Sequence, residues 1–153
     1  PTGPHLYAIR AGGQEIVIAG EQGTVLRSQD AGQTFSRLPV PYKGSFFTLE
    51  LPGAHDIVVA GLRGNVWKSA DAGATWTQVM NPVPVSITAS AVDAQGHLWL
   101  ANQAGMVLSS TGEALIPTPA KLPPLTGLLP LKTDQALALS VAGALPVTLG
   151  TPK

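Results

Sequence analysis

The chain has 153 residues, of which 44% are hydrophobic and only 12% charged, so its composition favours a folded core and excludes intrinsic disorder. Nine basic residues balance nine acidic ones, which argues against a nucleic-acid-binding protein or a polybasic membrane-surface protein. The absence of cysteine excludes disulfides, cysteine-based zinc sites and thiol catalysis, and no apolar run reaches the roughly 18 residues of a membrane span.

Short strand-like segments follow one another from the start of the chain. They are rich in β-branched or aromatic residues and occupy 6–9, 15–19, 24–28 and 34–38. Turn residues such as Gly12-Gly13 and Gly20 separate them. No window of helical length has a 3.6-residue period between these turns, so the first forty residues predict four strands and no helix.

A ten-residue pattern then recurs every 41 positions. It reads AGEQGTVLRS at 19–28, AGLRGNVWKS at 60–69 and ANQAGMVLSS at 101–110, and a degenerate copy, LSVAGALPVT, lies at 139–148. Four strands in a unit of about 40 residues are typical of a β-propeller blade. The sequence therefore predicts an all-β propeller with four-stranded antiparallel blades at about 6–41, 42–82, 83–124 and 125–150.

The first two copies carry a repeated octet, SQDAGQTF at 28–35 and SADAGATW at 69–76. It falls between the third and fourth predicted strands, where the chain must reverse tightly. An Asp in a turn accepts hydrogen bonds from backbone N–H groups ahead of it, and Gly permits a positive φ. We interpret the octets as structural turns, in preference to a direct functional role, through Ser28, Asp30, Gly32, Thr34, Phe35, Ser69, Asp71, Gly73, Thr75 and Trp76.

The octet Ser-x-Asp-x-Gly-x-Thr-Trp resembles the Asp-box of bacterial neuraminidase repeats. Together with the preceding AGxxGxVxxS pattern, it is similar to propellers of the photosystem II stability and assembly factor family. That resemblance covers residues 6–110 clearly and 111–150 faintly, and it implies a seven-bladed ring. The third copy departs from the octet, since Thr111 stands near the Asp position, so its turn is expected to be built differently.

The last part of the chain is less regular. The proline-rich segment 117–130 is interpreted as an outer edge of the third blade, because edge strands tolerate proline. The fourth copy offers strands at 125–130, 135–140 and 145–150 but no fourth strand. Propellers avoid exposed edges, so we expect either that the chain is the C-terminal half of a longer propeller or that two copies assemble one ring.

A sialidase-like glycosidase or a carbohydrate-binding propeller is the alternative function. Sialidase chemistry needs an arginine cluster, a Tyr nucleophile backed by Glu, and an acidic general acid/base. The arginines include Arg27, which has Lys68 at its repeat position, and Tyr7 is expected in the core. The three histidines show no metal-ligand spacing. The sequence therefore predicts no catalytic residue, metal or cofactor.

Exposed residues that break the repeat are the candidates for binding. Arg63 replaces Gln22 and Ala104 at the turn between second and third strands, and Tyr42 and Lys43 lie in the loop between the first two blades. Loops on a rigid scaffold commonly carry recognition. We expect a non-enzymatic scaffold that binds a protein partner. The resemblance implies an assembly or stability factor for a membrane-protein complex on the extracytoplasmic (periplasmic) side.

Overall fold

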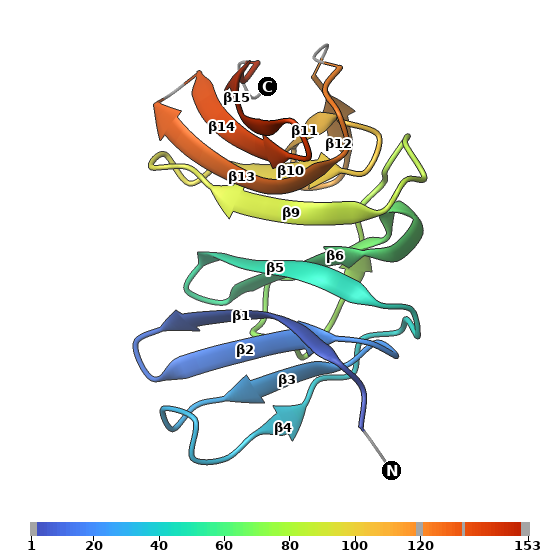
Figure 1. Cartoon of the computed structure of the whole chain (residues 1–153). Helices are drawn as coiled ribbons and strands as arrows, with labels where there is room; N and C mark the ends of the chain where they lie inside the picture. Colours follow the sequence, from blue (N-terminus) through green and yellow to red (C-terminus); the bar gives the residue numbers. More distant parts are fainter. Residues whose placement is uncertain (1–2, 119–120, 133, 151–153) are drawn as a thin grey trace.

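The computed structural model describes residues 3–118, 121–132 and 134–150. Within these residues the chain forms fifteen β-strands and one short 3-10 helix, η1 (Leu62–Gly64). The strands make four antiparallel sheets that follow one another along the chain (Figure 1). The predicted all-β class is confirmed. No helix in this part of the chain has the length and apolar character needed to cross a bilayer.

Each sheet is a meander in which strands adjacent in sequence pair with each other. The first sheet contains β1 (Leu6–Gly12), β2 (Glu15–Gly20), β3 (Val25–Ser28) and β4 (Ser36–Arg37). The second contains β5 (Phe46–Gly53), β6 (Asp56–Gly61), β7 (Val66–Ser69) and β8 (Thr77–Gln78). The third contains β9 (Ile87–Val92), β10 (Leu98–Asn102), β11 (Val107–Ser110) and β12 (Leu115–Pro117). The fourth has three strands in the described residues, β13 (Leu125–Lys132), β14 (Gln135–Ser140) and β15 (Gly143–Thr148).

Alternation along the strands explains how the sheets stack. Successive side chains of a strand point to opposite faces of the sheet. In β6, Val58 packs toward the third sheet, whereas Ile57 and Val59 pack toward the first. Both faces of the second sheet are therefore apolar, which is why its strands read as nearly continuous hydrophobic runs.

Three apolar cores fill the three junctions between consecutive sheets. The junction between the first and second sheets includes Val17, Val25, Phe46 and Leu49. The junction between the second and third sheets includes Val58, Ile87, Leu100 and Leu108. The junction between the third and fourth sheets includes Trp99, Val107, Leu125 and Ala138. Strands β1, β5, β9 and β13 contact one another in that order, and Figure 1 shows them crossing the stack one after another. These four strands form the inner edge of the stack.

The prediction that the proline-rich segment 117–130 forms an outer edge of the third blade is wrong for most of its length. Only Leu115–Pro117 forms the outer strand of the third sheet, and the end of the segment, from Leu125 onward, is part of β13 at the inner edge of the fourth sheet. Pro130 is accommodated there because the pairing of β13 with β14 shifts register between Pro130 and Lys132. β13 is also an edge strand of its sheet, at the inner side of the stack, so an edge position together with this local irregularity admits the proline.

Candidate partner-binding site

The antiparallel sheets give the stack two ends with different loops. We call the end with the β2–β3, β6–β7 and β10–β11 turns and the sheet-to-sheet connections the loop end. There, the Gly23 amide donates to the Gly44 carbonyl (2.8 Å) and the Leu62 amide to the Ser45 carbonyl (2.9 Å), so each turn is fastened to the next connection. The opposite end, the hairpin end, holds the β1–β2 and β5–β6 hairpins and both octets. Tyr42, Lys43 and Arg63 all lie at the loop end.

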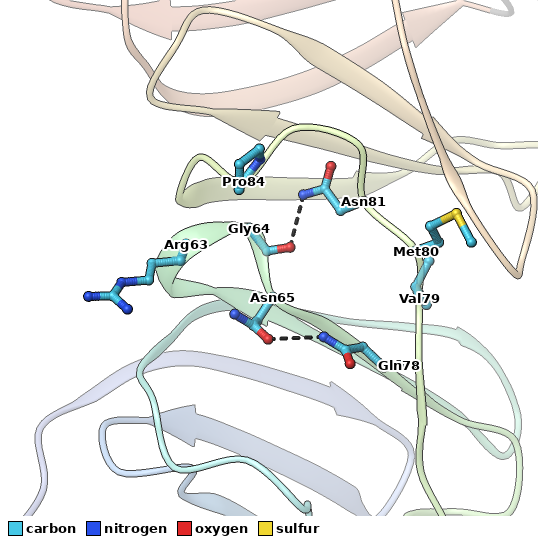
Figure 2. Close-up of a pocket in the computed structure, with 8 residues that line it drawn as sticks. All are labelled: Arg63, Gly64, Asn65, Gln78, Val79, Met80, Asn81 and Pro84. Atoms are coloured by element: carbon cyan, nitrogen blue, oxygen red, sulfur yellow. Dashed lines mark hydrogen bonds between the residues drawn. The ribbon is translucent and has the colours of Figure 1, made fainter.

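Arg63 borders a hollow of about 420 Å³ in the second sheet (Figure 2). The floor is tied together by side-chain amides, since Asn81 Nδ2 donates to the Gly64 carbonyl (2.9 Å) and Gln78 Nε2 to Asn65 Oδ1 (3.1 Å). Met80, 72% exposed, and Pro84 add apolar surface. The result is a preformed depression with polar and apolar walls.

An equivalent hollow of about 520 Å³ lies in the first sheet. Most of its lining residues stand 41 positions before those of the second-sheet hollow: Gln22, Gly23, Arg37, Leu38, Pro39, Val40 and Lys43 correspond to Arg63, Gly64, Gln78, Val79, Met80, Asn81 and Pro84. Tyr42 completes the lining. The repeat therefore places two similar depressions side by side at the loop end, one per sheet.

Backbone geometry presents Arg63 to solvent. Its φ is 56°, in the left-handed region, as is that of Gln22 at the matching position. The Arg63 amide donates to Ser86 Oγ (3.1 Å), which fastens the turn to the following connection. Figure 2 shows its side chain extending away from the other lining residues. Its guanidinium forms no ion pair with any residue that the structure describes.

Tyr42 links the two hollows. It lines the first, and its hydroxyl donates to the Leu62 carbonyl beside the second (3.2 Å). Its ring stacks near Trp67, with 6.4 Å between centroids, and packs against Phe46 at 5.3 Å. Burial raises the pKa of the Tyr42 hydroxyl, while the nearby Arg63 charge acts in the opposite direction. Tyr42 is therefore a packed support for the loop end.

The two ends also differ in charge, although the chain as a whole is neutral. Among the described residues, the loop end carries four basic side chains and one acidic one, a formal charge of +3: Arg37, Lys43, Arg63, Lys121 and Glu21. The hairpin end carries three basic and seven acidic side chains, a formal charge of −4: Arg27, Lys68, Lys132, Glu15, Asp30, Asp56, Asp71, Asp93, Glu113 and Asp134. Composition conceals this separation because the two sums nearly cancel.

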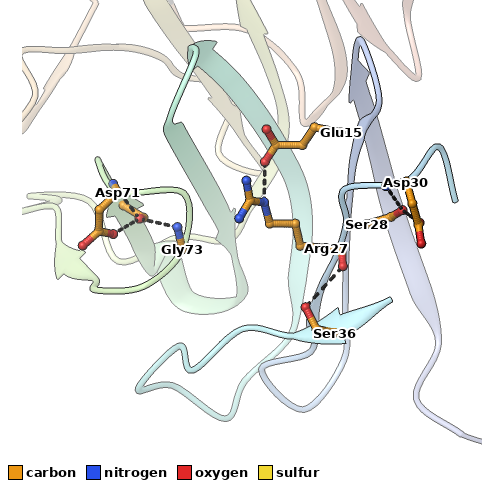
Figure 3. Close-up of polar contacts among 8 residues, drawn as sticks. Glu15, Arg27, Ser28, Asp30, Ser36, Asp71 and Gly73 are labelled. Atoms are coloured by element: carbon orange, nitrogen blue, oxygen red, sulfur yellow. Dashed lines mark hydrogen bonds and ion pairs between the residues drawn. The ribbon is translucent and has the colours of Figure 1, made fainter. Parts of the chain in front are cut away.

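The octets form two closely similar hydrogen-bonded turns. In the first, Asp30 accepts from the Thr34 amide (2.9 Å), the Thr34 hydroxyl (2.6 Å) and the Ser28 hydroxyl (2.7 Å). Asp71 repeats these contacts with Thr75 and Ser69 at 2.6–2.8 Å, and Figure 3 shows both aspartates folded back onto their own turns. The hydrogen bonds, led by the threonine hydroxyl, lower the pKa of each carboxyl to about 2.

Glycine geometry completes these turns. Gly32 and Gly73 have φ of 89° and 91°, and their amides donate to Ser28 Oγ and Ser69 Oγ, each at 2.8 Å. The following aromatic residues differ, because Trp76 Nε1 donates to the Gly73 carbonyl (3.0 Å) and the ring is half-buried against the first junction, whereas Phe35 is exposed. The aspartates and glycines thus serve their own loops.

The third sheet closes the corresponding turn without an Asp. The Thr111 hydroxyl donates to the Ala114 carbonyl (3.1 Å), and the Gly112 amide donates to Ser110 Oγ (3.1 Å). The Thr111 hydroxyl also accepts from the Ala114 amide (3.3 Å), so it bonds to one residue, whereas Asp30 and Asp71 each accept from two different residues of their turns. This turn is built differently, in the way that the lost Asp indicates.

Tyr7 contradicts the sequence expectation. It is 47% exposed, and its hydroxyl donates to Glu21 Oε1 (2.8 Å). Its ring meets Phe47 of β5 edge to face, with 5.4 Å between the ring centroids, and this contact covers only part of the side chain. This Tyr–Glu pair, fourteen residues apart, has no local sequence signal. The hydrogen bond to Glu21 raises the pKa of the Tyr7 hydroxyl, which keeps the phenol protonated.

The arginines do not gather into one cluster. Arg10 binds Glu50 across the first junction, Arg27 Nε binds Glu15 Oε1 at 2.6 Å (Figure 3), and Arg37 donates to the Gln22 carbonyl. The described residues also contain no group of three or more His, Asp or Glu side chains able to hold a metal ion. The described arginines therefore do not converge as they would around the carboxylate of a sialidase substrate, and the described acidic and histidine side chains do not converge as they would around a metal ion.

A polar network at the inner edge joins residues that no local sequence pattern connects. Glu50, on β5, accepts two hydrogen bonds from Arg10 of β1, at 2.7 and 3.0 Å, and one from Ser90 of β9, at 2.8 Å. Thr48 bonds to Ser90. Each residue looks isolated in the sequence, and only the stacking of β1, β5 and β9 joins them. The network links the first three sheets.

Comparison with solved structures gives this architecture its name. A structure of YCF48 bound to D1 peptide matches 92% of this chain and 50% of its own, with a TM-score of 0.63 and 15% identity. The chain has the fold of a β-propeller. An ancestral GH74 enzyme matches 95% of the chain and 23% of its own, with a TM-score of 0.77 and 13% identity. The resemblance to the assembly-factor propellers is confirmed at the level of fold, and each sheet is a propeller blade.

A third matching structure is nearly the same length as this chain. The computationally designed Ika4 protein matches 98% of the chain and 94% of its own, with a TM-score of 0.77 and 13% identity. By contrast, the chain spans about half of the YCF48 chain that it matches. No family model matches the chain, and no curated protein matches it in sequence. At these identities the likeness is one of fold alone.

Proposed function

We propose that the chain is a non-enzymatic propeller scaffold that binds a protein partner at its loop end. The pair of repeat-related hollows beside Lys43 and Arg63 supports this proposal most directly. Two adjacent depressions with matching lining positions suit an extended segment that places one side chain in each. Both cations lie at the rim, where a bound segment can reach them.

Charge defines the class of segment. The loop end has a formal charge of +3, and Lys43 and Arg63 form no ion pair with a described residue. Complementary charge accelerates encounter and selects against wrong partners more than it adds raw affinity. The partner is therefore an extended segment with acidic side chains or a free carboxylate. YCF48, a propeller of similar fold, has a structure with a bound D1 peptide.

The wider role that we propose is assembly or stabilisation of a membrane-protein complex from the extracytoplasmic (periplasmic) side. The Asp-box pattern of the octets and the fold shared with YCF48 support this role. Expression of the full-length gene with an epitope tag, followed by fractionation, tests the compartment. Recovery of the protein only with cytoplasmic markers would contradict it.

Glycoside hydrolysis or carbohydrate binding is the competing function, and the exposed Tyr7–Glu21 pair is the feature that favours it. Two observations weigh against it. The described arginines are separated from one another, with Arg10, Arg27 and Arg37 each bound to a different partner, and Glu21 favours the protonated form of the phenol. An assay of the purified chain with fluorogenic sialosides and glucosides tests this alternative. Turnover lost in Tyr7→Phe would replace our proposal with an enzyme.

Affinity capture from native membranes tests the scaffold. The bait is the purified chain, compared with the double variant Lys43→Glu/Arg63→Glu. The matched control is Lys68→Glu/Lys132→Glu, which makes the same change in net charge at the hairpin end. We expect the loop-end variant to lose the captured protein and the hairpin-end variant to retain it.

Salt dependence provides a second readout, because exposed charge pairs weaken as ionic strength rises. Capture by the parent chain should decline between low and high salt. Equal capture by both double variants would show that the loop end is not the binding surface, and it would overturn the proposal.

A further inference from the structure

Within the residues that the structure describes, the stack ends in two apolar faces that no further sheet covers. On the outer face of the first blade, which we call the leading face, lie Ile9, Ile16, Ile18 and Leu26. On the outer face of the fourth blade, the trailing face, lie Leu129, Leu137 and Leu139. Ile9 is 58% exposed and Leu139 is 50% exposed, which is high for large aliphatic side chains in the middle of strands.

The repeat shows what covers such a leading face. The second-blade residues at the positions of Ile9, Ile16, Ile18 and Leu26 are Leu49, Ile57, Val59 and Trp67. Leu49, Ile57 and Val59 are buried in the junction with the first blade, and Trp67 packs against it. The leading face is therefore one half of a blade–blade junction.

The trailing face is the other half. Leu137 and Leu139 stand 38 positions after Trp99 and Ala101, the same offset that relates Gly143 to Gly105. Trp99 and Ala101 are fully buried against the fourth blade. Leu129 pairs with Leu137 across the β13–β14 ladder and so lies on the same face. The fourth blade thus presents the surface that normally receives the next blade.

We infer that the trailing face of one copy of this chain packs on the leading face of a second copy, and that two copies close one propeller ring. The two faces are complementary halves of one junction, and each molecule carries one of each. The chain also spans about half of the YCF48 chain that it matches, so two copies supply a comparable set of blades. Head-to-tail contacts that close after two copies give a two-fold ring without uncovered faces.

Light scattering after size-exclusion chromatography measures the mass of the unmodified 153-residue chain. We expect twice the 15.7 kDa of one copy, with dissociation only on strong dilution. A mass of one copy at every concentration would overturn the inference and leave the faces to another partner. A concentration-dependent series of larger species would overturn closure of the ring. Neither result bears on capture of the partner at the loop end.

Charge substitutions identify the faces. Ile9→Lys and Leu139→Asp each place a charge in the proposed junction, so each variant alone should shift to one copy while keeping its β-sheet circular dichroism. The control is Met80→Asp, because Met80 is 72% exposed yet lies outside both faces, and it should remain at two copies.

Mixing the two charge variants tests the pairing. In a head-to-tail ring, the charges introduced by Ile9→Lys and Leu139→Asp meet in one junction and the other junction is unaltered. An equimolar mixture should therefore recover the two-copy mass. A dimer that pairs two leading faces or two trailing faces offers no such rescue, because in the mixture it would place one altered face against an unaltered face of the same kind. Failure of the mixture to associate would overturn the head-to-tail arrangement.

Discussion

Arg10 and Glu50 are forty positions apart, yet the Arg10 guanidinium donates two hydrogen bonds to the Glu50 carboxylate across the first blade junction, at 2.7 and 3.0 Å. The side chains differ in environment, since that of Glu50 is 9% exposed and that of Arg10 is 42% exposed. The carboxylate is the member that cannot recover hydration if its partner is lost. This asymmetry makes a prediction about the two halves of the pair.

Arg10→Met should destabilise the protein by about 2–3 kcal/mol, because it leaves a buried carboxylate without its cation. Glu50→Leu should cost less, about 1–2 kcal/mol, since Arg10 can be hydrated and Ser90 keeps its bond to Thr48. The double variant should lose less than the sum of the two. Urea denaturation of all three variants measures this coupling, and strict additivity would show that the pair contributes no net interaction.

The octet aspartates should act as turn supports. Asp30→Ala and Asp71→Ala should lower the melting temperature by similar amounts and additively, because the turns lie in different blades and share no partner. Asp134→Ala, an exposed carboxylate at the same end, is the control and should melt like the parent. A variant of Asp71 that melts normally but abolishes partner capture would identify the octet as a binding site.

Acid titration should reveal the same carboxylates. Their pKa in the fold is about 2, below the ordinary 3.8, so their stabilisation is complete above the ordinary pKa and is lost as the pH falls toward 2. Thermal melts at pH values between 5 and 2 measure the loss. Asp30→Ala/Asp71→Ala should show a shallower decline than the parent chain, and identical slopes would contradict the assignment.

Trp76 and Phe35 occupy the same octet position but should differ in energetic weight. Trp76→Ala should cost about 1–3 kcal/mol, less than the 3–5 kcal/mol of a fully buried aromatic, because the ring is half-buried. Phe35→Ala should cost less than about 1 kcal/mol, since its ring is largely exposed. Chemical denaturation followed by circular dichroism compares the two. Equal losses of unfolding free energy in the two variants would contradict the expectation that burial of the Trp76 ring gives it the larger contribution.

Gly44 should control the position of Tyr42. A Cβ at residue 44 would meet the Tyr42 hydroxyl and ring, so Gly44→Ala must displace this side chain from the loop end. Burial raises the pKa of the Tyr42 hydroxyl above its ordinary value of 10. The contribution of the buried neutral phenol to folding stability is therefore fully present below pH 10 and is lost as the pH rises through the pKa of the folded state. Ultraviolet titration of tyrosinate should therefore show one residue ionising at lower pH in Gly44→Ala than in the parent. Unchanged titration would mean that Tyr42 keeps its place.

Several features of this protein were determined by local sequence. The 41-residue period and the short apolar, β-branched segments at 15–19 and 56–60 predict strands and repeated sheets, because strand formation and tight turns depend on neighbouring residues. The octets are equally local, since Asp30 bonds only within residues 28–34. For the same reason, the missing Asp near Thr111 is by itself enough to indicate an altered turn.

Other features were decided only by tertiary structure. The Arg10–Glu50–Ser90 network joins three blades, the separation of charge depends on which end each loop occupies, and the two hollows form where turns meet connections from distant parts of the chain. Tyr7 contacts Phe47 of β5 yet stays 47% exposed, although its repeat position resembles a core residue. Strand periodicity specifies which face a side chain takes, whereas the order of stacking determines what, if anything, covers that face.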